Sequence, residues 1–476
     1  MGQEITQTQF GPGDVERFRR ALETETALAR HREREGGYSS RGPIGGFEIE
    51  AWLVDEDLRP APCNAPFLEA LADPMATPEL ARFNIEINNR PRELTGRALS
   101  AFHDELSATW RRVRETAEGL GLHAVQIGIL PTLAPDDLRL ANMSALKRYQ
   151  ALNEQVLRAR AGRPLTVDIV GRETLHHVHH DVMLESATTS FQIHLQVPAP
   201  MAARHYDAAI MTSAPMVALG ANSPYLFGAD LWDETRIPLF EQSVQCGGYE
   251  EAARGPLHRV GFGSGYAQDA LTDCFEENLR HFPILLPMHT EAAPERFAHL
   301  RLHNGTIWRW NRPLLGFDDD GRPHLRIEHR VLPAGPTLID DIANAAFFFG
   351  LVNMLAEGPA SALPFTQAKD NFYQAARLGL DAAIEWPGGP RRPLRRLILH
   401  ELLPLARRGL ERLGIDATDA GRYLDIVERR VASGRTGAVW QRRFVARHGR
   451  DFHALLASYL AQQETDLPVH TWDDAC

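Results

Sequence analysis

Residues 46–55 have the sequence GFEIEAWLVD, which predicts a β-strand. Alternate residues of a strand share a face, so Glu48 and Glu50 point to one side and the apolar residues between them to the other. Two residues along a strand span roughly 6.6 Å, and at an effective dielectric constant of about 20 two carboxylates at that distance repel by roughly 2.5 kcal/mol. A packed strand would need a positive charge, a proton or a metal ion there, whereas a solvated edge would dissipate the repulsion. The stretch alone leaves both interpretations open.

Three further stretches alternate in the same way, at residues 82–89, 189–197 and 324–331. Their polar faces carry Asn84, Glu86 and Asn88, then Ser190, Gln192, His194 and Gln196, and finally Arg326, Glu328 and Arg330. Strict alternation indicates a sheet with one face on the core. Carboxylates and imidazoles are metal ligands, and guanidinium groups bind phosphate or carboxylate. The sequence therefore predicts an α+β fold in which a curved antiparallel sheet, packed with helices, lines an active site.

Composition limits the class of protein. The chain has 476 residues, of which 44% are hydrophobic and 24% charged, as in ordinary soluble globular proteins. The N-terminus has no basic region followed by an apolar core, so no secretory signal is expected. The most apolar stretch, residues 342–355, is interrupted by Asn344 and Asn353 and indicates a buried helix rather than a membrane span.

Cysteine usage and charge exclude further classes. The four cysteines form no CxxC pair, which argues against a zinc ribbon or a disulfide scaffold and favours a cytoplasmic location: Cys63, Cys246, Cys274 and Cys476. A net charge of −11 argues against extensive nucleic-acid binding. Neither of the two lysines, Lys147 and Lys369, stands in a GxxxxGK[ST] phosphate-binding loop.

The remaining pattern indicates how the chain is divided. Residues 11–36 predict a charged helix, which we assign to an N-terminal helical extension over residues 1–40. Residues 41–476 then form a single catalytic domain, of which 337–476 is mostly helical. Within that domain we expect a strand at 122–130, a helix at 142–161, and C-terminal helices at 337–357, 365–383, 394–413, 417–433 and 436–462.

Two features do not point to a definite role. Residues 176–180, HHVHH, form a dense histidine cluster, but adjacent side chains of an extended segment point apart and no HExxH helix accompanies them, so a structural or surface role is favoured. Residues 225–268 are rich in aromatic residues and glycine without periodicity, which suggests a flexible loop over a site. The segment GFGSG at 261–265 lacks the GxGxxG spacing of a dinucleotide-binding loop.

Several short motifs, in order along the chain, resemble those of carboxylate–amine ligases of the glutamate–cysteine ligase type, whose fold is similar to that of glutamine synthetase. They are the G-x-E-x-E strand at 46–50, a second acidic strand at 84–87, the S-x-Q-x-H strand at 188–194, the ANSP turn at 221–224, the E-x-R strand at 326–330, and helical segments at 371–380 and 437–441. Three features depart from the family pattern. The C-G-x-H-V-H-V strand of one family branch is not matched, since His194 stands in QIHLQ, and the chain has an added N-terminal helix and a longer insert at 225–300. These departures bear on the acceptor amine more than on the ATP half of the chemistry.

The resemblance implies a set of site residues. Magnesium or manganese ions would be held by Glu48, Glu50, Glu86, His194 and Glu328. Catalytic roles would fall to Arg330, Arg312 and Glu50, with the two arginines neutralising the transferring phosphoryl group or a substrate carboxylate. The ATP site would include Gln192, Arg330, Trp308 and Asn304.

The expected chemistry is an ATP-dependent, ADP-forming ligation of the γ-carboxylate of glutamate to the amine of cysteine, as in glutathione biosynthesis, through a γ-glutamyl phosphate. Partners would be these small molecules, with no nucleic acid or membrane, and a homo-oligomer is possible. Three alternatives stay open: a ligase of the same fold with another acceptor or donor, a metal-dependent phosphotransferase or hydrolase, and an inactive regulatory protein. The intact Glu, His and Arg set argues against the last.

Overall fold

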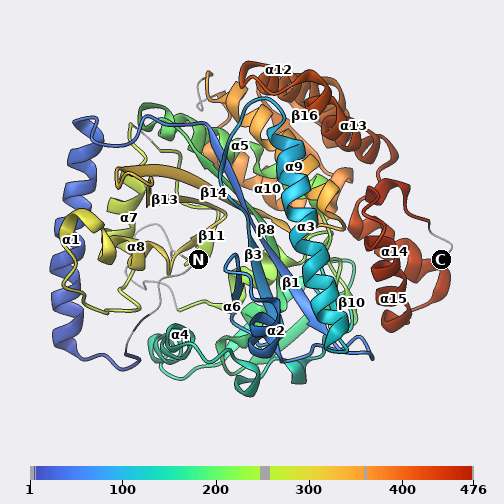
Figure 1. Ribbon diagram of the computed structural model, residues 1–476, viewed down its shortest axis with the longest axis horizontal. Helices are drawn as coiled ribbons and strands as arrows, with labels where there is room; N and C mark the ends of the chain where they lie inside the picture. The colour runs from blue at the N-terminus through green and yellow to red at the C-terminus, as the bar shows by residue number, and fades with distance from the viewer. Residues whose placement is uncertain (1–4, 6, 247–257, 268, 359–361, 474–476) are drawn as a thin grey trace.

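The computed structural model describes residues 5, 7–246, 258–267, 269–358 and 362–473. At its centre lies a curved antiparallel β-sheet, which Figure 1 shows running through the middle of the molecule with helices around it. Within the described residues the strands follow the order β13 (Asn311–Phe317), β14 (Pro323–Pro333), β8 (Ser190–Gln196), β1 (Ile44–Val54), β3 (Asn84–Asn88) and β2 (Ala76–Pro78). Two short strands, β4 (Arg92–Glu93) and β5 (His123–Val125), also pair with β1. The predicted fold class is confirmed.

The apolar face of the sheet packs on three helices, α3 (Ala98–Gly119), α5 (Ala202–Gly220) and α9 (Leu338–Leu355). Phe47 of β1 shows the packing: its ring lies 4.8 Å from that of Phe102 on α3 and 6.0 Å from that of Phe349 on α9. Burying one such side chain contributes about 1.5–3 kcal/mol. This burial fixes the opposite, polar residues of the same strands on the other face.

Helix α9 is the one described helix that is long and apolar enough to cross a membrane, and 78% of it is buried inside the protein. It crosses α12 (Leu403–Arg412) so closely that a Cβ placed on Gly409 would overlap the carbonyl group of Gly350. The stretch at 342–355 is therefore a core helix, as its interrupted apolar pattern predicted.

The C-terminal part is mostly helical, as predicted. It comprises α10 (Phe365–Leu378), α11 (Leu394–Leu397), α12, α13 (Ala417–Ser433), α14 (Gly437–His448) and α15 (Phe452–Gln463). Two expected boundaries are wrong. The helix at 365–383 ends where Gly379 has a φ of 55°, before the hairpin of β15 (Ala383–Trp386) and β16 (Gly389–Pro393). The single helix at 436–462 is divided at Gly449, whose φ is 83°, because a left-handed glycine ends a helix without interrupting the apolar pattern.

The N-terminal helix α1 (Pro12–Arg34) packs against α7 (Asp273–His281) and α8 (Ala298–Asn304), at the left of Figure 1. Its Phe18, Leu22 and Ala29 belong to the same apolar core as the sheet. Glu25 of α1 is buried and accepts hydrogen bonds from the backbone N–H of Leu300 (2.8 Å) and from Nδ1 of His299 (2.6 Å). Helix α1 therefore holds α8 in place.

Other segments differ from expectation. The strand expected at 122–130 is only β5, and β13 was not predicted as a strand. Residues 225–268, expected to be irregular, contain α6 (Arg236–Ser243), while 247–257 and 268 lie outside the described residues, as does Cys476. The remaining α-helices and strands are α2 (Asn64–Leu71), α4 (Lys147–Ala159), β6 (Leu165–Val170), β7 (Thr174–His179), β9 (Tyr225–Leu226), β10 (Ala229–Asp230), β11 (Val260–Gly261) and β12 (Trp308–Arg309). Among the short 3₁₀ helices, η3 (Val182–Ala187) bears on the site.

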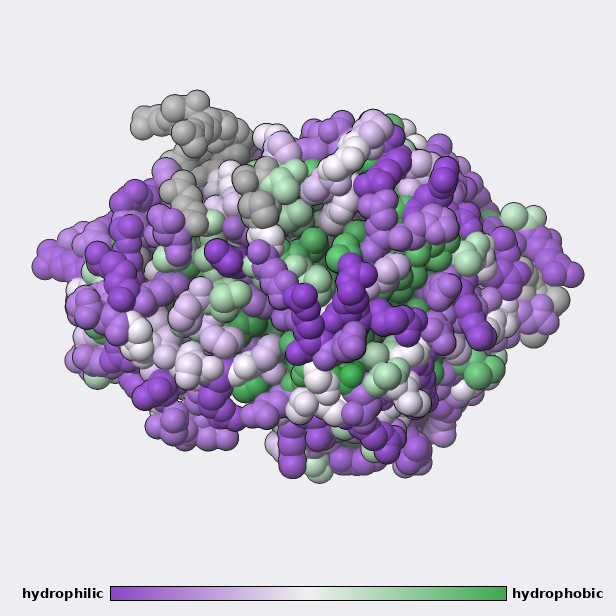
Figure 2. Space-filling view, turned by 90° about the horizontal axis from the view of Figure 1, so that it is seen from above, coloured by the Kyte–Doolittle hydropathy of each residue, from purple (hydrophilic) through white to green (hydrophobic). Residues whose placement is uncertain are grey.

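The surface is largely hydrophilic. Figure 2 shows one face, where hydrophilic residues dominate the periphery and hydrophobic ones show between them near the middle. The exposed large apolar side chains of the described residues are scattered along the sequence: Leu120, Leu140, Val170, Val178, Leu378 and Leu467. Single exposed apolar residues of this kind are ordinary on a protein surface.

Candidate active site

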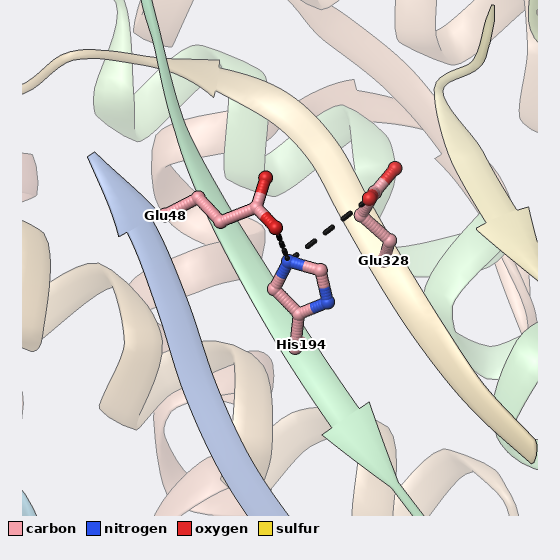
Figure 3. Close-up of side chains that lie close together, drawn as sticks. All are labelled: Glu48, His194 and Glu328. Carbon is pink, nitrogen blue, oxygen red and sulfur yellow. Dashed lines mark ion pairs between the residues drawn. The ribbon is translucent and has the colours of Figure 1, made fainter. Parts of the chain in front are cut away.

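Three neighbouring strands bring Glu48, His194 and Glu328 together on the polar face of the sheet. In the register of β8 with β14, His194 lies opposite Glu328, and in that with β1 it lies opposite Gly46, two residues before Glu48. Figure 3 shows the three side chains converging. Nε2 of His194 lies 3.1 Å from Oε1 of Glu48 and 4.0 Å from Oε1 of Glu328. One ligand atom from each residue lies within 4.8 Å of the others.

The donor set of this cluster fits a hard divalent cation. It offers two carboxylates and one imidazole, all buried, and both nitrogens of His194 are buried without a hydrogen bond of acceptable geometry to any described group. Burial alone would raise the pKa of Glu48, but its interactions with His194 and Arg330 hold it well below its usual range. An ionised carboxylate and an imidazole nitrogen are the forms in which these side chains bind Mg²⁺ or Mn²⁺.

Two arginines surround Glu328. Arg312 lies opposite it on β13 and donates two hydrogen bonds, from Nε to Oε2 (2.7 Å) and from Nη2 to Oε1 (3.0 Å). Nη1 of Arg330 lies 3.0 Å from Oε2 of Glu328 and also donates to Oε1 of Gln192. Burial would raise the pKa of Glu328, but Arg312 and Arg330 lower it to about 2. The carboxylate therefore stays ionised at neutral pH.

A bulge in β14 sets the place of Arg330. Between His329 and Leu332 the pairing with β8 shifts, so that one extra residue stands on β14. Such a bulge re-aims side chains at an otherwise regular strand. Arg330 consequently reaches both Gln192 and Glu328.

Glu50 and Glu86 lie opposite one another on β1 and β3, beside the first cluster. Glu50 accepts hydrogen bonds from the backbone N–H of Ser190 (2.7 Å) and from Nε2 of Gln192 (3.1 Å). Burial raises its pKa to about 7; Arg330 opposes this rise and Glu86 adds to it. The repulsion expected between Glu48 and Glu50 is thus relieved by His194 and Arg330 at Glu48, and by Arg330 together with hydrogen bonds from Ser190 and Gln192 at Glu50.

These groups line one cavity of about 230 Å³. Every residue assigned to the site from the sequence lines it, except His194, which belongs to the adjoining three-residue cluster. Asn304 lies in the wall, where its side chain donates to the carbonyl of Pro313 (2.9 Å) and accepts from Asn278 (2.9 Å). Trp308 belongs to β12 in the same wall. A role of Asn304 and Trp308 in binding ATP stays a prediction.

Sequence reasoning did not assign six ionisable residues that also line the cavity: Glu79, Glu185, Arg148, Tyr149, Arg301 and Arg326. Burial raises the pKa of Glu79 well above its usual value and that of Glu185 to about 7, and neighbouring carboxylates add to both shifts. Glu79 follows the short strand β2 and Glu185 lies on η3, so neither belongs to an alternating strand. Arg326, by contrast, lies on an alternating strand and shares its polar face with Glu328, so the sequence could have assigned it to the site.

The histidine cluster lies elsewhere. It forms part of β7, where Nδ1 of His176 is 2.6 Å from Oδ1 of Asp168 and Nε2 of His179 is 2.8 Å from Oδ1 of Asp181. None of these histidines is among the described residues that line the cavity. This placement supports a structural or surface role.

Comparison with known proteins gives a family and a fold. Residues 44–458 match the family model of glutamate–cysteine ligase family 2. A glutamate–cysteine ligase from Francisella tularensis in complex with AMP is 10% identical, with a TM-score of 0.51 over 89% of this chain and 92% of that one. A bifunctional glutathione synthetase from Pasteurella multocida is 12% identical, with a TM-score of 0.50 over 92% of this chain and 55% of that one, so this chain spans about half its length. No curated protein matches the sequence.

Proposed function

This chain belongs to glutamate–cysteine ligase family 2, and on that premise we propose that it is an ATP-dependent glutamate–cysteine ligase that forms γ-glutamylcysteine. The observation that carries the proposal is that Glu48 and Glu328 meet His194 in one cluster and share a cavity with Arg312 and Arg330. Family membership supports a ligase, and the cavity supports chemistry on a charged phosphoryl group.

The reaction has two steps. A carboxylate oxygen is a poor leaving group, so the γ-carboxylate of glutamate first takes the γ-phosphoryl group of ATP, which gives γ-glutamyl phosphate and ADP. The neutral amine of cysteine then attacks the acyl carbon, phosphate leaves, and the amine loses its proton. The products are the amide, ADP and phosphate.

The residues of the cavity divide this work. A magnesium or manganese ion bound by Glu48, His194 and Glu328, with Glu50 and Glu86 as further ligands, would supply positive charge to the phosphate oxygens. Arg330 and Arg312 stay charged beside Glu328 and would neutralise charge that develops on the transferring group. Glu50 accepts from Gln192, and Gln192 accepts from Arg330, so Glu50 orients the amide that positions this arginine.

We propose a cytoplasmic location as well, because the described cysteines, Cys63, Cys246 and Cys274, are free thiols.

The decisive experiment measures ADP release by the purified protein with ATP, magnesium and glutamate, with and without cysteine, together with the mass of the product. Cysteine-dependent ADP release and a mass of γ-glutamylcysteine would support the proposal. Glutamate-dependent release without a need for cysteine would retain the acyl phosphate and direct the search to other amines. ATP consumption without an amide would favour a phosphotransferase or hydrolase instead.

A matched pair of variants links the activity to the site. Glu50→Gln removes one carboxyl group from the wall of the cavity, and Glu115→Gln makes the same change at an exposed position on α3. We expect the first to abolish metal-dependent ADP release and the second to leave it unchanged. Full turnover by Glu50→Gln would contradict the assignment.

A further inference from the structure

One end of the cavity is lined by two arginines from separate parts of the chain. Arg301 lies on α8 at the exposed rim, and Arg326 lies on β14. Arg326 stands two residues before Glu328 on the same face, opposite Leu314 of β13 and Gln196 of β8. The arginines therefore flank the cavity on the side of Glu328 away from Arg330.

Neither arginine is neutralised by an ion pair. Among the described residues, no carboxylate lies within 4.0 Å of either guanidinium group, and Nε of Arg326 is buried without a hydrogen-bond partner. Asp318, the carboxylate bonded to Gln196 beside Arg326, is already used by other groups. It accepts from Ser39 (2.5 Å) and Gln196 (3.0 Å) and contacts Nδ1 of His324 (3.0 Å).

The charges of this pair act on each other. Partial burial against the cavity wall lowers the pKa of Arg301, and the charges of Arg326 and Arg296 lower it further. The carboxylates of Glu48 and Glu328, which line the same cavity, act on Arg326 through their negative charge, and a cation bound by them would cancel that effect. The two arginines would then hold adjacent positive charge that an incoming anion could neutralise.

The backbone that carries each arginine is held in place before any ligand arrives. Glu25 of α1 bonds the N–H of Leu300 and so positions the turn of α8 that carries Arg301. On the other side, Gly316 leaves room for Arg326, since a Cβ there would come within 3.0 Å of Nη1. Preorganised groups of this kind bind a ligand with little loss of conformational freedom.

We propose that Arg301 and Arg326 form an oxyanion subsite that binds a phosphate or carboxylate group of a substrate. The identity of the substrates rests on the proposed function; the subsite itself rests on the two unpaired guanidinium groups. The N-terminal extension and the insert at 225–300 would then serve a common purpose, because α1 holds α8, the helix that begins at the end of the insert and carries Arg301.

Titration calorimetry on the full-length protein with magnesium present tests this, with ADP, glutamate and cysteine as separate probes. The variants are Arg301→Gln and Arg326→Gln. The control is Arg296→Gln, an exposed arginine that contacts the same Phe317 ring as Arg301 but does not line the cavity. We expect each cavity variant to weaken binding of one and the same probe at least tenfold, Arg301→Lys to restore part of that binding, and the control to change nothing.

The probe that is affected identifies the group. Weaker binding of ADP would assign the subsite to phosphate, and weaker binding of glutamate or cysteine would assign it to carboxylate. Unchanged affinity for all three probes in both variants, with unaltered thermal unfolding, would overturn the proposal. Because Arg301 is exposed, its variant tests the subsite even if Arg326→Gln does not fold. The binding of each probe is measured without turnover, so this test remains valid even if the protein forms no amide.

Discussion

Arg312 binds the carboxylate of Glu328 from the neighbouring strand through two hydrogen bonds, with Nε 2.7 Å from Oε2 and Nη2 3.0 Å from Oε1. Both side chains line the cavity. Removing one member of a buried ion pair lowers the free energy of unfolding far more than replacing both, because the other charge is left buried without a partner. The pair also keeps Glu328 ionised, since its pKa is lowered to about 2 chiefly by Arg312 against the effect of burial.

We expect Arg312→Gln to lower ADP release at least a hundredfold, because the variant loses a phosphoryl-neutralising charge and weakens the hold on Glu328. Steady-state kinetics with glutamate and ATP measure this. Arg322→Gln, at an exposed position in the turn between β13 and β14, serves as the control. Activity of Arg312→Gln within a few-fold of the parent would rule out a direct role.

The cluster of Glu48, His194 and Glu328 predicts a metal-binding defect in His194→Asn. The variant removes the imidazole ligand, so we expect Mn²⁺ to bind at least tenfold more weakly, as measured by calorimetry. The control is His176→Asn, on the exposed histidine of β7. Chelation of the metal in the parent protein should stop ADP release, and equal Mn²⁺ affinity in parent and His194→Asn would place the metal elsewhere.

Glu241 on α6 predicts a pH-dependent stability. Burial raises its pKa from 4.5 to about 7, while hydrogen bonds from Tyr373 (2.6 Å) and Trp310 (2.8 Å) oppose the rise. The folded state then binds more protons than the unfolded state between these pH values, so the stability that Glu241 contributes is present below about pH 4.5 and lost as the pH rises to about 7. The shift corresponds to a loss on the order of 3 kcal/mol.

Glu241→Gln should remove this loss. We expect the free energy of unfolding of the variant, relative to the parent, to be higher at pH 8 than at pH 5, as measured by denaturant titration at both values. A difference between variant and parent that does not change with pH would show that Glu241 does not titrate in this range.

The crossing of α9 and α12 predicts that Gly409→Ala destabilises the protein. A Cβ there would overlap the carbonyl group of Gly350, and only movement of the backbone can relieve the overlap. We expect a loss of about 1–3 kcal/mol or more in the free energy of unfolding. Gly119→Ala is the matched control, because no atom lies within 4 Å of its new Cβ, so the second substitution should be neutral or slightly stabilising.

Glu25 predicts a coupling between the N-terminal helix and the cavity. Glu25→Ala leaves the N–H of Leu300 and the imidazole of His299 without their acceptor, at a cost of about 1–3 kcal/mol. We expect a lower melting temperature and, at a temperature where the variant is folded, a higher KM for the substrate that binds beside α8. Glu23→Ala, at an exposed position of α1, is the control. An unchanged KM would mean that α1 contributes only stability.

The sequence was sufficient for those parts of the site that lie on alternating strands. Glu48, Glu86, His194 and Glu328 stand on strands whose apolar residues must face a core, so their side is set by the period of two. The register between the strands was not predictable, because it depends on contacts between residues far apart in the chain. The bulge after His329, which directs Arg330 to Gln192, is part of that register and was not predictable either.

Other residues lack any periodic signal. Strand β13 contains Pro313, Leu314, Leu315 and Gly316 in succession and does not alternate, so the strand that carries Arg312 was not predicted. Glu79 and Glu185 enter the cavity from a loop and a short 3₁₀ helix, where no pattern indicates the direction of a side chain. The division of 436–462 into two helices depends on the conformation of Gly449 and on the N-cap of α15 at Asp451.

The position of β8 between β1 and β14 has a consequence during synthesis on the ribosome. Strand β8 can pair with β1 as soon as it leaves the ribosome. Its other edge stays unpaired until β14, which lies far downstream in the sequence, has been synthesised. At about 5–20 residues per second, translation of the intervening chain takes on the order of ten seconds. For that time the nascent protein exposes a strand edge with unpaired backbone groups, the kind of surface that chaperones protect. Slow translation between the codons for β8 and β14 should therefore favour aggregation.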